Sequence, residues 1–89
     1  DIGPSLDMFV IEVFMKPGTE ADPEYIFIGY GYAGRGTLAS AVYLKTVIEP
    51  NLSRYTDDYY IVKWEDTNGN GHPDIPGTDT YTEMASGFP

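Results

Sequence analysis

A run of small, oxygen-bearing side chains occupies residues 66–74 of this 89-residue chain, and its spacing suits a hard metal ion. Acidic or amide side chains stand at every second position, so alternate side chains turn inward around one point. A glycine at the sixth position permits a sharp bend, the seventh residue offers its backbone carbonyl, and a further carboxylate stands at the ninth. The residues at these positions are Asp66, Asn68, Asn70, Gly71, His72 and Asp74. Because Ca²⁺ takes about six to eight oxygen ligands, the pattern predicts a calcium-binding loop.

The same loop resembles the calcium loops of thrombospondin type 3 repeats and, more distantly, those of dockerins and EF-hands. The likeness is strongest in Gly71-His72-Pro73-Asp74, because type 3 repeats often place proline before that aspartate. It covers about a tenth of the chain. The resemblance therefore implies bound Ca²⁺ and implies nothing about the fold of the other residues.

The predicted ligand set departs from the usual pattern at its last position. The twelfth residue, which normally supplies a chelating carboxylate, is Gly77. Asp79, two residues later, is the closing ligand we expect, and Glu83 is the alternative left open. Because two of the ligands are neutral amides, we expect weak binding, with Kd about 10⁻⁴–10⁻³ M as in extracellular modules. The competing interpretation, an Asn-Gly hairpin turn, leaves the two flanking aspartates unexplained.

Composition limits the partners of the chain. Fourteen carboxylates face five Lys and Arg residues, a net charge of −9, so neither nucleic acid nor an anionic membrane surface is an expected partner. There is no cysteine, and no apolar run is long enough to insert into a membrane. A domain of this size has a marginal core and usually needs a metal or a partner. The first residue, Asp1, and the sequon Asn51-Leu52-Ser53 lead us to expect a processed, secreted glycoprotein at the cell surface.

The pattern of apolar residues predicts one domain over 1–89 made mostly of strands. Period-two alternation and β-branched or aromatic residues predict strands at 8–15, 25–32, 59–64 and 79–84. Residues 38–48 fit both a strand and a helix beginning near Thr37, and the β-branched residues Val42, Thr46, Val47 and Ile48 favour a strand. Short strands separated by Gly and Pro turns predict an all-β fold, a small antiparallel β-sandwich of Ig-like or jelly-roll-like type.

Other motifs carry less information. Gly29-Tyr-Gly-Tyr-Ala-Gly34 matches a dinucleotide fingerprint, but Glu49 follows too closely for the helix and strand that such a site needs. These glycines instead predict a bend or a close backbone approach. Asp57 and Asp58 are adjacent and would point apart in a strand, which is unsuited to paired acid catalysis. With no activated nucleophile, we expect no enzyme activity and no catalytic residue.

Two functions remain open from the sequence. The first is a calcium-stabilised extracellular structural protein that forms a filament or surface layer with copies of itself. In this hypothesis residues 1–14, and Ile2 to Phe14 in particular, exchange as a strand with a neighbouring subunit. The alternative is a secreted carbohydrate-binding or adhesion module with calcium-stabilised loops, in which Trp64 and some of the eight tyrosines stack on a polysaccharide.

Overall fold

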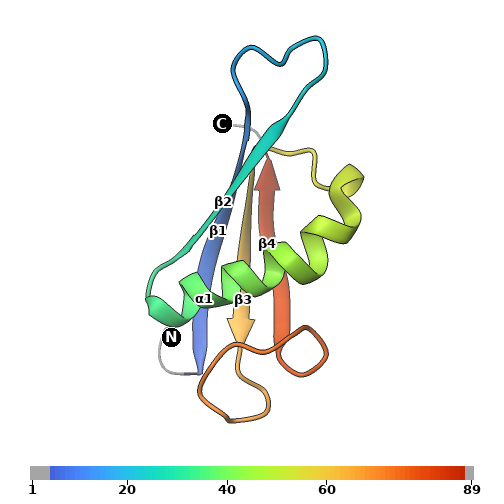
Figure 1. Ribbon diagram of the computed structural model, residues 1–89. Helices are drawn as coiled ribbons and strands as arrows, with labels where there is room; N and C mark the ends of the chain where they lie inside the picture. Colours follow the sequence, from blue (N-terminus) through green and yellow to red (C-terminus); the bar gives the residue numbers. More distant parts are fainter. Residues whose placement is uncertain (1–4, 88–89) are drawn as a thin grey trace.

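The structure, a computed structural model, describes residues 5–87. Four strands form one antiparallel sheet in the order β2-β1-β3-β4. A helical segment connects β2 to β3 and lies across one face of the sheet (Figure 1). The elements in chain order are β1 (Leu6–Met15), β2 (Tyr25–Gly31), α1 (Gly34–Tyr43), the π-helical turn η1 (Leu44–Ile48), the 3₁₀ segment η2 (Glu49–Arg54), β3 (Tyr59–Glu65) and β4 (Thr80–Gly87).

The fold is small, antiparallel and mostly β, as the alternation of apolar residues predicts. A sandwich is not confirmed, because the layer packed on the sheet is helical and no second sheet faces it within residues 5–87. The strand expected at residues 1–14 corresponds to β1, which pairs on both sides within its own chain. Residues 1–4, including Ile2, lie outside the described part. No helix in that part is long and apolar enough to cross a membrane.

The strand favoured for residues 38–48 is wrong, since this segment is helical. Its buried residues explain why. Ala39 and Tyr43 are four residues apart and face the sheet, while Ile48 follows five residues later, across the π-helical turn. The wider turn brings Ile48 back to the buried side. Packing of this stripe against β1 and β2 therefore overrides the β preference of Thr46, Val47 and Ile48.

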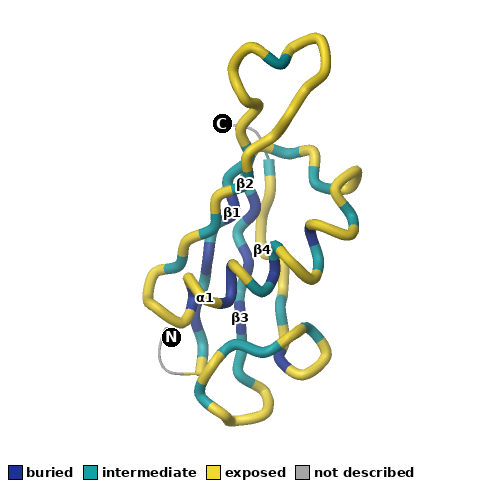
Figure 2. Tube along the Cα trace, in the orientation of Figure 1, coloured by how far each residue is buried: buried dark blue, intermediate teal, exposed yellow. Residues whose placement is uncertain are grey.

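The core lies between the helical segment and one face of the sheet, visible as the dark positions along β1, β3 and α1 in Figure 2. Its members alternate along the strands, as period-two packing requires. The buried hydrophobic residues are Phe9, Ile11, Tyr60, Val62 and Trp64 from the sheet, with Ala39, Tyr43 and Ile48 from the helical segment.

Glycines let α1 approach β2 closely. A Cβ atom added to Gly31 would lie 2.4 Å from the carbonyl carbon of Gly36, and one added to Gly29 would lie 2.6 Å from Oγ of Ser40. The expected close backbone approach in the 29–34 glycine motif is therefore present, with the backbone of α1 as the neighbour.

The start of α1 is capped from a distant strand. Ala33 precedes the helix and offers no side-chain cap, and Thr37, the expected cap, lies inside the helix. The carboxylate of Asp7, fully buried in β1, accepts the N–H groups of Ala33 at 3.1 Å and Gly36 at 2.8 Å. A buried anion at the positive end of the helix satisfies two N–H groups that the helix itself leaves free.

Candidate metal centre

Residues 66–79 form the connection between β3 and β4 (Figure 1). The connection begins directly after Glu65, the last residue of β3, where Asp66 N–H still donates to Ser5 O at 2.8 Å. It lies beside the start of α1, because Nε of Arg35 donates to the carbonyl of Gly71. Two elements of the fold therefore hold the segment in which the sequence predicts a calcium site.

Side chains of the loop bind the loop's own backbone. The two carboxylate oxygens of Asp66 accept the N–H groups of Gly69 at 3.0 Å and Gly71 at 2.7 Å. Further along, Oδ1 of Asn68 accepts the N–H of Asn70 at 3.3 Å, and Oδ1 of Asn70 accepts the N–H of His72 at 3.1 Å. These local turns are typical of Asx side chains and curl the chain around their oxygens.

Glycines permit this curvature. Gly71, the residue expected at the sharp bend, has φ of 84°, and Gly69 has φ of 76°. Residues with a Cβ atom rarely adopt such φ values, which explains the glycines at these two positions.

The ninth-position carboxylate completes the ring of side chains. Oδ2 of Asp74 accepts Nδ2–H of Asn68 at 2.9 Å and also Nδ2–H of Asn70. These two amide contacts lower the pKa of Asp74 below its ordinary value. Three of the predicted ligands, Asn68, Asn70 and Asp74, therefore contact one another through their side chains. The carboxylate of Asp66 binds the same loop through backbone N–H groups. His72 is exposed and joins the ring through its backbone N–H.

Asp79 lies beneath the loop and is 2% exposed. Its Oδ2 accepts the indole N–H of Trp64 at 3.0 Å and the backbone N–H of Asp74 at 2.8 Å. Within residues 5–87, its Oδ1 accepts one hydrogen bond, from Thr67 N–H at 3.3 Å. The residue nominated as closing ligand thus ties both ends of the loop to β3, and Oδ1 keeps the capacity to accept a further partner.

Glu83, the alternative closing ligand, is engaged elsewhere. Its Oε2 accepts the hydroxyl of Tyr43 and, at 2.9 Å, the hydroxyl of Tyr55. Burial raises the pKa of Tyr43, and the hydrogen bond to Glu83 raises it further. Glu83 therefore joins β4 to the helical segment. Of the two candidates, Asp79 is the one that contacts the loop.

The donor chemistry of the loop fits a hard, weakly held cation. Its side chains offer carboxylate and amide oxygens, the ligands that Ca²⁺ prefers, and each oxygen that accepts one hydrogen bond retains a second lone pair. Among residues 5–87 no three His, Cys, Asp or Glu side chains gather in one place, so a cation here would also use the amide and carbonyl oxygens. At Oδ2 of Asp74 the ion would compete with the hydrogen bonds from Asn68 and Asn70, which weakens binding there.

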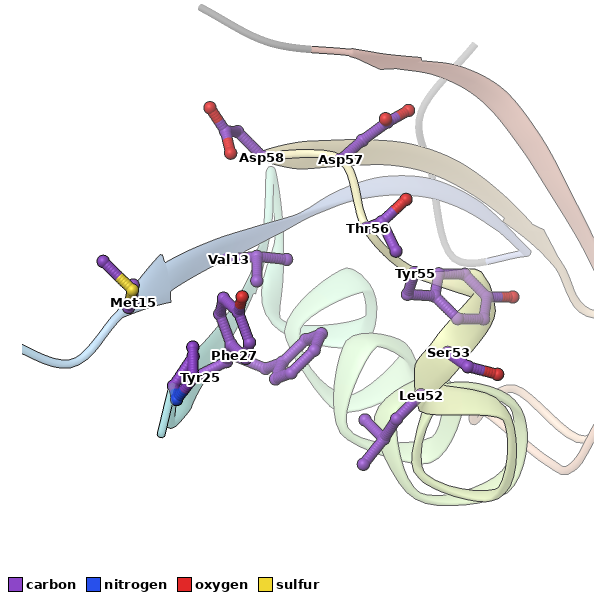
Figure 3. Close-up of a pocket in the computed structure, with 11 residues that line it drawn as sticks. Val13, Met15, Tyr25, Phe27, Leu52, Ser53, Tyr55, Thr56, Asp57 and Asp58 are labelled. Atoms are coloured by element: carbon purple, nitrogen blue, oxygen red, sulfur yellow. The ribbon is translucent and has the colours of Figure 1, made fainter. Parts of the chain in front are cut away.

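A separate groove of about 540 Å³ lies at the other end of the sheet, between the β1–β2 hairpin and residues 52–58 (Figure 3). Phe27, Leu52 and Tyr55 supply its apolar walls. The carboxylates of Asp57 and Asp58 point away from each other and from those walls. The two adjacent acids therefore point apart, as their spacing predicts.

Two other predicted features occupy defined positions. Trp64 is fully buried, so its predicted role as a sugar-stacking platform is wrong. Nδ2 of Asn51, the atom to which a glycan would attach, donates to Val47 O at 2.8 Å, so glycosylation would have to break this bond. No protein-family model, no curated protein and no solved structure matches the chain.

Proposed function

We propose that this chain is a calcium-stabilised, extracellular structural protein that assembles with copies of itself through its sheet edges. The observation that carries the proposal is the convergence of Asn68, Asn70 and Asp74 above a buried anchor, Asp79. Such a loop, with Kd about 10⁻⁴–10⁻³ M, would be about 50–90% occupied at about 1 mM Ca²⁺, the level found outside cells, and almost empty inside them.

The assembly part of the proposal is supported by the two edge strands, β2 and β4. Tyr32 N–H donates to Met8 O, so the even-numbered N–H groups of β2 face β1. Because these groups alternate, the N–H groups of Phe27 and Gly29 point away from β1. An added strand would pair with them and extend the sheet. β1 is central, so strand addition at an intact edge needs less rearrangement than exchange of residues 1–14.

Calcium binding is tested by thermal unfolding with and without the ion. At 10 mM Ca²⁺ the expected stabilisation is RT ln(1 + [Ca²⁺]/Kd), about 1.4–2.7 kcal/mol, or about 6–20 °C in midpoint. Asp74→Asn should abolish the increment because it removes a ligand charge, whereas Asp58→Asn, the same change on an exposed acid outside the loop, should retain it. An equal midpoint rise with Mg²⁺, or in both variants, would show only screening of the −9 charge.

Two direct readouts complete the test. Tb³⁺ substituted for Ca²⁺ should show emission sensitised by Trp64, whose indole binds the loop anchor, and added Ca²⁺ should quench that emission by competition. Negative-stain microscopy should show filaments or sheets in Ca²⁺ and fewer in EDTA. Uniform small particles under both conditions would refute assembly through the edges.

Polysaccharide binding is the second candidate, favoured by two exposed tyrosines. Tyr25 is 58% exposed and Tyr32 is 70% exposed, both on or beside β2. Binding of the wild-type protein to a glycan array, lost in a Tyr25→Ala, Tyr32→Ala double variant, would support it. An array without hits would refute it.

A further inference from the structure

The face of the sheet opposite α1 is apolar over half of its length. The register places Val10 between Tyr30 and Ile61, and Phe14 beside Ile26. Side chains directly opposite in antiparallel strands share a face, and α1 packs on the other one. We call these residues, with Ile28, the outer patch: Val10, Phe14, Ile26, Ile28, Tyr30 and Ile61.

The outer patch is exposed to an extent unusual for such side chains. Phe14, Ile26, Ile28 and Tyr30 are each between 45% and 47% exposed. For side chains of about 200 Å², this is about 90 Å² each and about 370 Å² together. The partly exposed Val10 and Ile61 bring the patch to about 500 Å², the size at which exposed apolar surface marks an interaction site.

We propose that a second copy of this chain covers the outer patch, so that two sheets pack face to face about a two-fold axis. The self-assembly proposed above is the premise for choosing a copy as the occupant. The pairing uses side chains on one face of the sheet, three of them on β2, whereas edge pairing uses backbone groups of β2 such as the N–H groups of Phe27 and Gly29. It needs no metal. Two copies would remove about 1,000 Å² of apolar surface from water, which reaches the size of a specific if weak interface. The sandwich expected from the sequence would then form between subunits.

The pattern of charge agrees with a two-fold pairing. The end of this face away from Phe14 is more polar. Lys63 and Glu65 form an ion pair of 3.4 Å there, beside Thr82 and Thr80 of β4, although Leu6 and Met8 of β1 share this end. A two-fold axis through the outer patch lays apolar half on apolar half and leaves the polar halves at the rim, as in other protein interfaces. Beside Phe14 the face is hollowed by about 510 Å³, which offers space for side chains of the second copy.

Glu12 is a charged residue that lies within the area bounded by the outer patch. It lies between Ile28 and Tyr59 in the ladder, and its carboxylate accepts the hydroxyl of Tyr30. Pairing would bring two such carboxylates out of water, which opposes association. Glu12→Gln removes the charge and keeps an acceptor for Tyr30, so this variant should associate more tightly than the wild type.

Sedimentation velocity of the full chain in EDTA tests the pairing without the metal. We expect a monomer–dimer equilibrium with Kd of about 10–100 μM, as befits an interface at the lower size limit. Ile28→Glu should weaken association about 100-fold, because it buries an unpaired charge. Leu38→Glu, the same type of change at a 58% exposed position on α1, should leave it unchanged. Far-UV circular dichroism should show both variants folded, since neither residue is in the core.

Three results would overturn the pairing: a wild type that stays monomeric at about 1 mM, equal dissociation in Leu38→Glu and Ile28→Glu, or weaker association in Glu12→Gln. Failure of the calcium or filament experiments leaves this test unaffected, because it uses a closed pair in EDTA. If those experiments fail and the dimer is still observed, the pairing through the outer patch stands, and the proposals of calcium binding and filament formation fall.

Discussion

Replacing Asp79 by Asn is the sharpest test of how the loop is held. The side chain is 2% exposed and accepts three hydrogen bonds, two on Oδ2 and one on Oδ1. Asparagine has nearly the same shape but only one oxygen. Its best orientation keeps that oxygen on Trp64 and Asp74 and turns the NH₂ group toward the N–H of Thr67.

The expected loss follows from these contacts. Two bonds change from charge-assisted to neutral, about 1 kcal/mol each, and the third is replaced by two opposed donors, about 1 kcal/mol more. The sum, about 3 kcal/mol, is a large part of the about 4–13 kcal/mol expected for a chain of this length. Urea unfolding in EDTA, followed by far-UV circular dichroism, measures it. Asp58→Asn corrects for the charge removed and should change stability by less than about 0.5 kcal/mol.

The same variant tests whether Asp79 is a calcium ligand. The oxygen with capacity to spare is Oδ1, which carries only the 3.3 Å bond to Thr67. In the expected Asn orientation an NH₂ group takes this place, so the calcium-dependent increment should fall by more than about half. Metal-free stability within 0.5 kcal/mol of Asp58→Asn, on the scale of an ordinary surface change, would refute the anchoring role. A lower stability with an unchanged increment would refute the ligand role alone.

Three further outcomes are expected. Gly31→Ala should lower the free energy of unfolding by about 2 kcal/mol or more, because the added Cβ would lie 2.4 Å from the backbone of α1. Gly34→Ala has open space around the added Cβ and should be neutral or stabilising. Urea unfolding measures both changes. Asp7→Ala removes the acceptor of two helix N–H groups and one strand N–H, and circular dichroism should show a largely unfolded chain, with Asp7→Asn intermediate. Burial, and then the hydrogen bond to Glu83, raise the pKa of Tyr43 in the folded chain, so this tyrosine ionises first in the unfolded chain. The stability that Tyr43 contributes is therefore complete below about pH 10 and is lost as the pH rises above that value. Tyr43→Phe should flatten that alkaline decline in unfolding measurements between pH 9 and 11.

The strands were predictable because each has a clear period of two. β1, β2 and β3 fall within a few residues of the expected ranges, and the last strand, expected at 79–84, runs from Thr80 to Gly87. The helix was not predictable from its composition. The helix is stabilised by packing on the sheet, which buries Ala39, Tyr43 and Ile48. Only a helix with a wide turn places these three residues on one side.

Part of the site was visible in the sequence and part was not. The loop side chains curl around neighbours within five residues, so spacing alone carries that information. The anchoring of the loop depends on Trp64 meeting Asp79, and the cap of α1 depends on Asp7 meeting Ala33, 26 positions along the chain. One clue was available: Asp7 shares the inward side of β1 with Phe9 and Ile11, where an acid needs a hydrogen-bond partner.

The hydrogen bonds within the loop determine how calcium can act. Asp66, Asn68 and Asn70 accept hydrogen bonds from the loop's own N–H groups, and we expect these bonds to be able to hold the loop curled without an ion. Binding energy is then not needed to order the chain, unlike in small domains that fold only with their metal. Against this, the two amide contacts on Oδ2 of Asp74 would compete with an ion for that oxygen. Calcium should therefore raise the unfolding midpoint of a domain that is folded without it, and circular dichroism in EDTA should show the native spectrum. An unfolded spectrum in EDTA would mean that the hydrogen bonds of the loop cannot hold the loop without the ion.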